Sequence, residues 1–230
     1  MPTDLYLIRH GESVANVEPI IGGMRGDVGL TDRGRDQARL LEQRLRAERM
    51  RADQLYVSTL PRAVETGEYV ARALGLPVQA DDDLQELRPG EADGWSVDHW
   101  RAAFGGESRF VTDPFREFAP GGESWAGFLV RAGGALARLV ARHENETIVA
   151  VCHGGVLEAS FHLAFGLGGT GQRVAFAPLN TSITHWRHRR GHEGNSEWTL
   201  VTFNDAGHLA AAGVREESPR EAVPTPANED

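Results

Sequence analysis

The stretch LYLIRHGES (residues 5–13) decides the fold and the candidate site of this chain. Its first four residues are an apolar run, which predicts a buried strand, and the polar residues that follow mark the end of that strand. A second stretch of the same design, TIVAVCHGG (residues 147–155), lies far along the chain. Because ligands of open α/β sheets collect at the carboxyl ends of the strands, we expect His10 and His153 to meet at that edge.

Apolar runs bounded by turn residues alternate along the chain with longer segments of helical periodicity. We therefore predict an α/β fold, a three-layer α/β/α sandwich with a mostly parallel central sheet. Strands are expected at residues 5–8, 55–57, 147–151 and 182–186, with 198–203 pairing with the last of these as a hairpin. Helices are expected at residues 31–49, 61–74, 124–143 and 154–165.

Residues at the expected helix starts support these boundaries. Thr31 and Ser124 can accept hydrogen bonds from the free amides of a first helical turn. Pro61 suits a first turn because the amide that proline lacks would be unpaired there. Arg62 would then lie at the start of a helix, close to the edge where the two histidines are expected.

The length of 230 residues fits one domain or two small ones, and we favour a single domain over residues 1–213. Within it, residues 95–120 carry six aromatic side chains with weak periodicity. This segment is either a lid or substrate-selecting insertion or a subsidiary core, and the sequence favours neither. Residues 214–230 have no apolar stripe, which predicts a disordered tail.

Composition excludes several classes of function. The net charge of −9 and the pI of about 5.5 argue against partners such as nucleic acid or an anionic membrane. All 24 basic residues are arginine, which excludes a lysine Schiff base and a P-loop lysine. Cys152 is the only cysteine, so an intramolecular disulfide and a multi-cysteine zinc site are excluded. Without a signal-peptide pattern or a run of transmembrane length, we expect a cytoplasmic protein.

The residues expected at the sheet edge suit phosphoryl chemistry. Arg9 and Arg62 each offer a planar fork that stays charged and can bind two phosphate oxygens. A neutral imidazole such as that of His10 can attack phosphorus, and His153 can donate a hydrogen bond to the transferred group. Arg62 itself lies in the stretch STLPRAVET (residues 58–66).

These three stretches resemble the histidine phosphatase superfamily, the group that includes the cofactor-dependent phosphoglycerate mutases, and the resemblance covers residues 4–204. It implies a phosphoglycerate mutase-like fold, a small phosphorylated substrate, no metal and no cofactor. It also implies that His10 is the nucleophile that becomes a phosphohistidine. The resemblance gives the phosphoryl group three further catalytic partners, Arg9, Arg62 and His153.

By the same resemblance, Glu86 in DLQELR (residues 83–88) is the general acid that protonates the leaving oxygen and then the base for the attacking water. The sequence departs from the family at Ala92, in GEADG (residues 90–94), where tryptophan is usual. Contacts to the phosphate or the substrate are implied for Gly11, Asn16, Gly22, Gly23 and Gly154.

Three other patterns in the sequence resemble parts of other kinds of site. A cysteine phosphatase built on Cys152 would need an arginine at position 158, where this chain has Glu158. The acidic run at residues 81–83 would suit an aspartyl-phosphate phosphatase, but the accompanying lysine is missing, so a solvated turn is the better interpretation. An exposed hairpin is the better interpretation of three histidines whose spacing matches no strong metal motif, His185, His188 and His192.

We predict a metal-independent phosphomonoester hydrolase. The stretch PGGES (residues 120–124) resembles a feature common among the phosphatases, and the lysine and long insertion of the mutases do not follow Glu86. A cofactor-dependent phosphoglycerate mutase is the closest alternative, and a non-catalytic phosphate- or phosphoprotein-binding module is the alternative of another class. An exposed sheet edge would also allow a homodimer. Three arginines either bind a second anion or are surface charges, which we favour: Arg101, Arg109 and Arg116.

Overall fold

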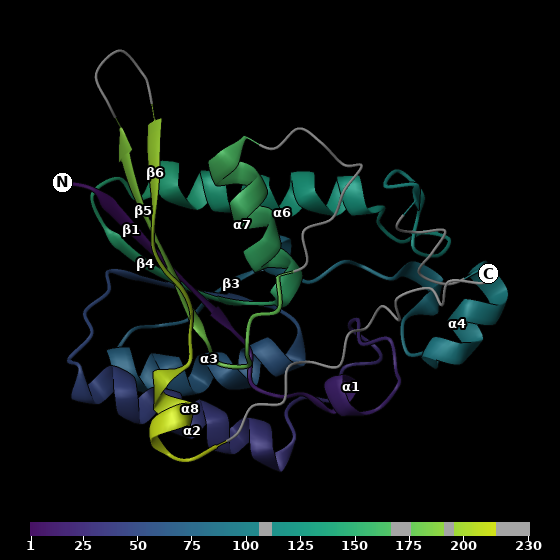
Figure 1. The fold of residues 1–230 in the computed structure, drawn as a ribbon, viewed down its shortest axis with the longest axis horizontal. Coiled ribbons are helices and arrows are strands. Elements are labelled where there is room, and N and C mark those ends of the chain that lie inside the picture. Colours follow the sequence, from purple (N-terminus) through teal and green to yellow (C-terminus); the bar gives the residue numbers. More distant parts are fainter. Residues whose placement is uncertain (106–111, 167–175, 191–195, 215–230) are drawn as a thin grey trace, which may run out of the picture.

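The computed structural model describes residues 1–105, 112–166, 176–190 and 196–214, which form one sheet with helices on both faces (Figure 1). The strands are β1 (Thr3–Arg9), β2 (Gln54–Ser58), β3 (Gln79–Asp81), β4 (Thr147–Cys152), β5 (Ile183–Arg190) and β6 (Ser196–Asp205). They lie in the order β3-β2-β4-β1-β5-β6. The first four strands of this order pair in parallel, whereas β5 is antiparallel to both of its neighbours.

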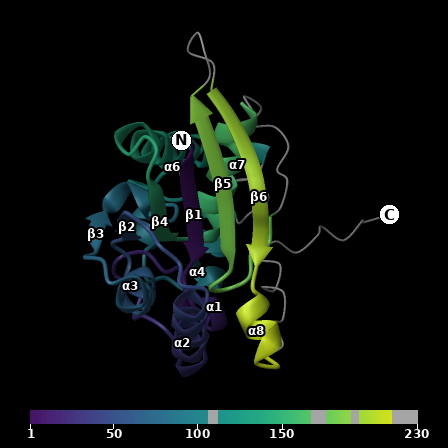
Figure 2. The same cartoon turned by 90° about the vertical axis from the view of Figure 1, so that its left-hand side faces the viewer.

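The helices form the two outer layers of the molecule. They are α1 (Val14–Val17), α2 (Asp32–Ala47), α3 (Pro61–Leu74), α4 (Val97–Phe104), α6 (Trp125–Arg142), α7 (Gly154–Phe165) and α8 (Gly207–Ala211), with short 3₁₀ helices at η1 (Asp82–Leu84) and η2 (Gly90–Ala92). Helices α6 and α7 cover one face of the sheet, and α2 and α3 cover the other (Figures 1 and 2). The prediction of a three-layer α/β fold with a mostly parallel sheet is therefore confirmed.

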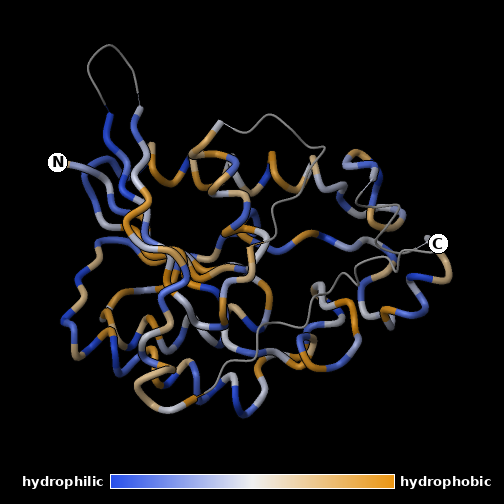
Figure 3. Tube along the Cα trace, viewed as in Figure 1, coloured by the Kyte–Doolittle hydropathy of each residue, from blue (hydrophilic) through white to orange (hydrophobic). Residues whose placement is uncertain are grey.

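Alternation along β1 divides the core between the two faces. Leu5 and Leu7 pack into the cluster beneath α6 and α7, whereas Ile8 packs into the cluster beneath α2 and α3. All three are at most 1% exposed, and full burial of such a side chain contributes about 1.5–3 kcal/mol. Figure 3 shows the hydrophobic segments gathered in these central strands. Side chains alternate between the two faces along the whole of β1, so the same alternation also sets the direction of its last side chain, that of Arg9.

The register of the parallel strands sets the position of the site. Arg9 at the end of β1 pairs with Cys152 at the end of β4, so His10 and His153 leave adjacent strands at the same level. Strand β2 ends beside β4 at Ser58, directly before α3 begins at Pro61. The carboxyl ends of three neighbouring strands thus place their following residues at one edge of the sheet.

The predicted helix starts agree closely with the structure. Thr31 caps α2 by accepting from the Gly34 amide, and Ser124 caps α6 by accepting from the Gly127 amide. Helices α3 and α7 have the bounds that the sequence predicts, whereas both strands of the hairpin extend further than expected. Among the described elements, those that the sequence did not predict are all short: β3, α1, α4, α8 and the 3₁₀ helices η1 and η2.

The described part of residues 95–120 builds a small aromatic core. The ring of Trp100 stacks on Phe118 with centroids 4.3 Å apart, and its indole Nε1 donates to the Phe118 carbonyl at 2.8 Å. Ala92 and Ala119 complete this buried cluster. Residues 106–111 lie outside the described residues, as does the predicted tail apart from Val214. The single domain and the lid remain predictions.

Two further expectations concern the outer strands of the sheet, which could pair with a second copy, and the length of the helices. Strands β3 and β6 are the outer strands of the sheet, and pairing of an edge with a second copy remains a prediction. No helix in the described part of the chain is long and apolar enough to span a lipid bilayer.

Candidate active site

His10 lies just beyond β1 and is held in one orientation. Its ring Nδ1 donates to the Gly11 carbonyl at 2.6 Å, which fixes the tautomer and leaves Nε2 as the nitrogen with the lone pair. Nε2 in turn accepts a hydrogen bond from Arg62 Nε at 3.1 Å. The backbone is fixed as well, because the Asn180 side-chain amide donates to the His10 carbonyl at 3.0 Å.

The environment of His10 keeps its imidazole neutral. The side chain is buried, and burial together with the positive charges of Arg62 and Arg9 lowers its pKa well below the usual value. The imidazole is therefore unprotonated at Nε2 at neutral pH, and the Nε2 electron pair accepts the hydrogen bond from Arg62. That is the form that can attack phosphorus.

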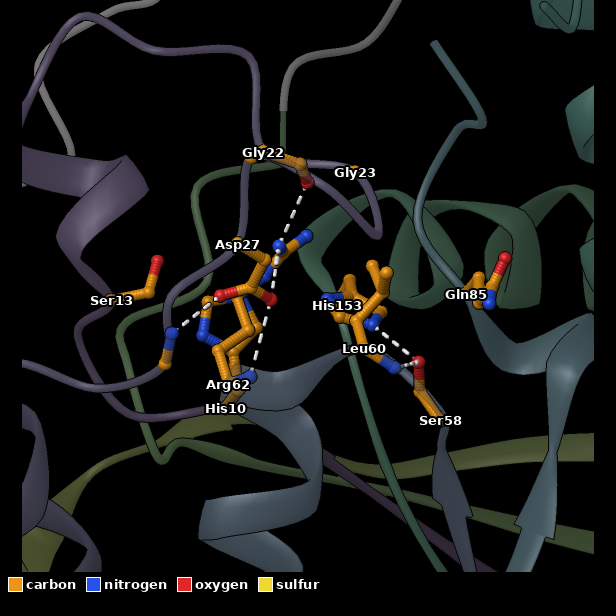
Figure 4. Close-up of polar contacts among 12 residues, drawn as sticks. His10, Ser13, Gly22, Gly23, Asp27, Ser58, Leu60, Arg62, Gln85 and His153 are labelled. Atoms are coloured by element: carbon orange, nitrogen blue, oxygen red, sulfur yellow. Dashed lines mark hydrogen bonds and ion pairs between the residues drawn. The ribbon is translucent and has the colours of Figure 1, made fainter. Parts of the chain in front are cut away.

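Arg62 lies at the start of α3 and has its guanidinium divided between three partners (Figure 4). Nε faces His10, whereas Nη1 donates to the Gly22 carbonyl and to Asp27 Oδ2, each at 2.9 Å. Asp27 Oδ2 also accepts from the Arg62 amide at 3.2 Å, and its Oδ1 accepts from the Gly29 amide. The Asp27 side chain is fully buried, so Arg62 is oriented by a buried counterion.

Arg9 is buried at the end of β1, where its Nη1 donates to the Pro178 carbonyl. Its charge contributes to the lowered pKa of both His10 and His153, which places the guanidinium close to both rings. The Arg9 carbonyl accepts from the Thr181 amide at 2.9 Å. The segment that carries Pro178 and Thr181 therefore holds both ends of this residue.

His153 lies directly after β4, at the start of α7, and faces His10, with the two ring centroids 5.1 Å apart. Its Nε2 lies 2.7 Å from Ser58 Oγ, and the Leu60 amide donates to the same oxygen at 3.4 Å (Figure 4). The Ser58 hydroxyl can donate to Nε2, and in that tautomer the ring proton lies on Nδ1. Nδ1 is buried without a hydrogen-bond partner, as expected of a donor that awaits a ligand.

Burial is also the main influence on the charge of His153. Burial, followed by the positive charge of Arg62, lowers its pKa well below the usual value. The His153 ring is therefore neutral at neutral pH.

Glu86 follows η1 and reaches the first turn of α7. Its Oε2 accepts from the Gly155 amide at 2.9 Å, and its Oε1 accepts from the Leu87 amide at 3.1 Å. Arg131 of α6 donates to the Glu86 carbonyl and forms a two-armed ion pair with Glu123. The Arg131 contact fixes the backbone at Glu86, and the two amide contacts fix the orientation of its carboxyl group.

Arg62 and Glu86 share the lining of one cavity of about 230 Å³. Arg62 contacts His10 Nε2, and the Glu86 carboxyl group stands at the amino end of α7. The cavity can therefore receive a phosphoryl group between a cation and a carboxyl group, with the basic nitrogen of His10 in contact with that cation. The other residues that line it are Ala15, Asn16, Ile21, Gly22, Leu87, Pro89 and Phe118.

The residues predicted to contact substrate fall into two groups. Asn16 and Gly22 line the cavity, although Asn16 Oδ1 accepts from the Ser13 amide and caps α1. Gly154 begins α7 beside the site. Gly11 and Gly23 have structural partners instead.

Packing explains Gly11, and a side-chain contact explains Gly23. A Cβ at Gly11 would lie 2.6 Å from the Gly34 carbonyl oxygen, so close approach of two backbones requires glycine there. The Gly23 amide donates to Asp93 Oδ1 at 3.0 Å. Contact of either glycine with a phosphate or a substrate remains a prediction.

Asp27 and Ser58 are two of the polar residues at the site that the sequence interpretation missed. Ser58 opens the quoted STLPRAVET stretch, whereas Asp27 lies in none of the quoted stretches. Neither could be given a role, because each acts through a partner that is distant in sequence.

The competing sites of the sequence interpretation do not form in the described residues. Cys152 is buried in the core, and burial raises the pKa of its thiol, which is the opposite of an activated nucleophile. His185 is buried, stacks on Tyr6 and hydrogen-bonds Asp4, rather than lying on an exposed hairpin as expected. No cluster of three metal-ligating side chains occurs within the described ranges, and His192 and Arg109 lie outside them.

The chain is similar in sequence and in fold to known proteins. The model of the histidine phosphatase superfamily (branch 1) matches residues 5–206. Phosphoglycerate mutase-like protein 4 of Arabidopsis thaliana is 31% identical over 220 residues, which cover 91% of this chain and 88% of that protein. The 2,3-bisphosphoglycerate-dependent phosphoglycerate mutase of Brucella canis is 31% identical over 189 residues, which cover 80% and 90%.

A solved structure of similar fold is a mutant phosphoserine phosphatase from Entamoeba histolytica in complex with phosphoserine. It superimposes with a TM-score of 0.73 at 27% identity and covers 90% of this chain and 99% of that one. The family match spans nearly all of the described sheet, from β1 to the end of β6. This chain therefore belongs to the histidine phosphatase superfamily, branch 1.

Proposed function

We propose that the protein is a metal-independent phosphomonoester hydrolase that acts through a phosphohistidine on His10, with Glu86 as general acid and base. The observation that carries the proposal is the Arg62–His10 pair. A neutral, tautomer-locked imidazole presents Nε2 to an arginine that also lines the cavity containing Glu86. A small phosphorylated molecule is the substrate, and a cytoplasmic location remains our expectation from the sequence.

Substrate binding would exchange partners around His10. The phosphoryl oxygens take the hydrogen bonds of the Arg62 guanidinium and of His153 Nδ1, and Arg9 adds positive charge. Loss of the Arg62 contact frees the Nε2 electron pair, which can then point at phosphorus. The arginines supply the fixed positive charge that metal ions supply in many other phosphoryl-transfer enzymes.

The chemistry proceeds in two displacements. Nε2 forms a bond to phosphorus while the bond from phosphorus to the leaving oxygen breaks, and the Glu86 carboxylic acid gives that oxygen its proton. The Glu86 carboxylate then accepts a proton from a water molecule that attacks the phosphohistidine. Phosphorus–nitrogen cleavage returns the electron pair to Nε2 and releases inorganic phosphate.

A phosphoglycerate mutase is the second candidate, and the identity to named mutases favours it. A mutase must keep the phosphohistidine and return the phosphoryl group to a reoriented product. Against it stands the absence of lysine anywhere in the chain, which removes a residue that the mutase segment after Glu86 carries. We therefore place hydrolysis first.

Phosphate release from a panel of phosphomonoesters in the presence of a chelator tests the proposal. We expect chelator-resistant release that His10→Ala abolishes and that His99→Ala, a change at an exposed histidine on α4, leaves intact. Isomerisation of phosphoglycerate that depends on its bisphosphate primer would instead favour the mutase. Phosphate binding without turnover of any ester would favour a binding module.

A further inference from the structure

Arg62 Nη1 donates to two acceptors that lie at the two ends of one short loop, residues 22–27 (Figure 4). The Gly22 carbonyl stands at the start of this 22–27 loop and Asp27 Oδ2 at its end, each 2.9 Å from Nη1. The loop has the sequence GGMRGD, in which Met24 is apolar but exposed. Glycines allow a backbone many conformations, so a loop of this composition needs polar contacts to hold one of them.

A single carboxylate, that of Asp93, supplies these contacts. Its Oδ1 accepts from the amides of Gly23 and Gly26 at 3.0 and 2.9 Å, and its Oδ2 accepts from the Arg25 amide at 2.9 Å. Hydrogen bonds to an ionised acceptor are stronger than those to a neutral one. Three amides of the 22–27 loop therefore converge on one side chain, which is only 10% exposed.

The backbone of the loop packs directly on the segment that carries Asp93. A Cβ at Gly23 would lie 2.7–2.8 Å from the Asp93 carboxylate atoms, and a Cβ at Gly26 would lie 2.8 Å from backbone atoms of Gly94. The Gly94 amide also donates to the carbonyl of Ile21, directly before the loop, at 2.9 Å. The segment thus determines where the two acceptors of Arg62 lie.

Asp93 also forms an ion pair with Arg25, but this pair does not account for the packing. Arg25 Nε lies 3.8 Å from Asp93 Oδ2, and the Arg25 side chain is 68% exposed. An exposed ion pair contributes little in water. The amide contacts are therefore the ones that shape the 22–27 loop.

The same segment carries the acidic side of the cavity. It begins at Glu86, and its residues Leu87 and Pro89 line the cavity together with Glu86. Ala92, directly before Asp93, is buried in the small aromatic core. Asp93 therefore connects a fixed part of the fold, next to the carboxyl group of the site, with the loop that orients its arginine.

We propose that Asp93 is a positioning residue, which holds the 22–27 loop in the shape that aims the Arg62 guanidinium at the phosphoryl group. This inference rests on the proposed hydrolase function and assigns to it a residue outside the lining of the cavity. Without the carboxylate, the two acceptors of Arg62 lose their fixed positions. Arg62 must then be ordered when phosphate binds, which weakens binding.

A double-mutant cycle on the binding of inorganic phosphate tests this role. Isothermal titration calorimetry gives Kd for the parent, Asp93→Ala, Arg62→Ala and the double variant. We expect Asp93→Ala to weaken binding about 3–10-fold, the cost of immobilising one long side chain. In the Arg62→Ala background it should have no further effect, because its influence passes through that arginine. An equal loss in both backgrounds would indicate a general structural role and overturn the inference.

Matched variants separate the amide contacts from charge and from the ion pair. Asp98→Ala removes an exposed carboxylate and should leave Kd unchanged. Asp93→Asn keeps an oxygen for the amides of Gly23 and Gly26 without the charge, and it should restore most of the affinity that Asp93→Ala loses. Arg25→Ala removes the ion pair but keeps the amide, so Kd should not change. A loss in Arg25→Ala as large as that in Asp93→Ala would overturn the inference.

A second measurement decides the question if Arg62→Ala does not fold. In the parent, the Arg62 Nε proton is hydrogen-bonded to the buried ring of His10, so its NMR signal should exchange slowly with water. We expect faster exchange in Asp93→Ala and parent-like exchange in Asp98→Ala. An unchanged rate in Asp93→Ala would overturn the inference.

The outcomes distinguish this inference from the function on which it rests. If the parent releases phosphate from esters and Asp93→Ala binds phosphate as tightly as the parent, the inference is overturned and the hydrolase stands. If the parent releases phosphate from no ester of the panel, the hydrolase is overturned and the role of Asp93 in its reaction with it.

Discussion

Replacement of Asp27 by alanine tests whether a buried counterion organises Arg62, the arginine that we propose to bind phosphate. The Arg62–Asp27 pair is 2.9 Å long, with side-chain exposures of 6% and 0%. Removal of one partner of such a pair leaves an uncompensated buried charge, which costs about 3–5 kcal/mol of stability. For a protein of this size, each kcal/mol lowers the melting temperature by about 2–4 °C, so we expect a decrease of roughly 6–20 °C.

Urea unfolding followed by tryptophan fluorescence measures the effect. The matched control is Asp36→Ala, which removes the partner of Arg39 in an exposed ion pair on α2 and should cost about 1 kcal/mol or less. Inorganic phosphate should stabilise Asp27→Ala more than the parent, because the bound dianion replaces the missing negative charge. If the free energy of unfolding decreased by no more than about 1 kcal/mol beyond the control, solvation by water would suffice for the Arg62 charge. The assignment of Asp27 as its necessary counterion would then be wrong.

Two further substitutions and one titration probe the remaining groups of the site. Glu86→Gln keeps the acceptor for the Gly155 amide but cannot donate a proton to the leaving oxygen. We therefore expect kcat to decrease about 10²–10⁴-fold for alkyl phosphates, whose leaving group needs that proton, and far less for 4-nitrophenyl phosphate. An equal decrease for both substrates would refute the role of Glu86 as the acid. Ser58→Ala removes the partner of His153 Nε2 and should lower kcat/KM about tenfold or more through loss of the tautomer, and unchanged kinetics would contradict that role. In an NMR titration of the substrate-free protein, the ring protons of His10 should shift only well below pH 6.5, because the pKa of His10 in the folded state is lowered. The same lowered pKa predicts that its contribution to stability is full above pH 6.5 and is lost as the pH falls. A titration midpoint of His10 near pH 6.5 would contradict both expectations.

The sequence predicts the strand ends well because their signal is local and strong. Apolar runs at β1 and β4 end in polar residues, and parallel pairing then brings His10 and His153 together without further information. Capping residues such as Thr31 also act on amides three residues away, so their effect is readable from spacing alone.

The loop contacts could not be predicted in the same way. Asp93 binds amides about 70 residues earlier in the chain, and Asp27 binds an arginine 35 residues later. No periodicity encodes such pairs, since they depend on the path of two loops in space. Gly11 shows the same limit, because its need for glycine comes from the Gly34 carbonyl and not from a ligand.

The hydrogen bond from Arg62 Nε to His10 Nε2 has a consequence for unwanted reactions. An acylating or alkylating reagent offers the guanidinium no anion, so it meets a histidine whose electron pair is already engaged and whose ring is buried. In the proposed reaction, a phosphate ester brings the negative charge that draws the arginine away and exposes the nitrogen. We therefore expect His10 of the substrate-free protein to react slowly with neutral electrophiles and to become reactive only when a phosphate ester is bound.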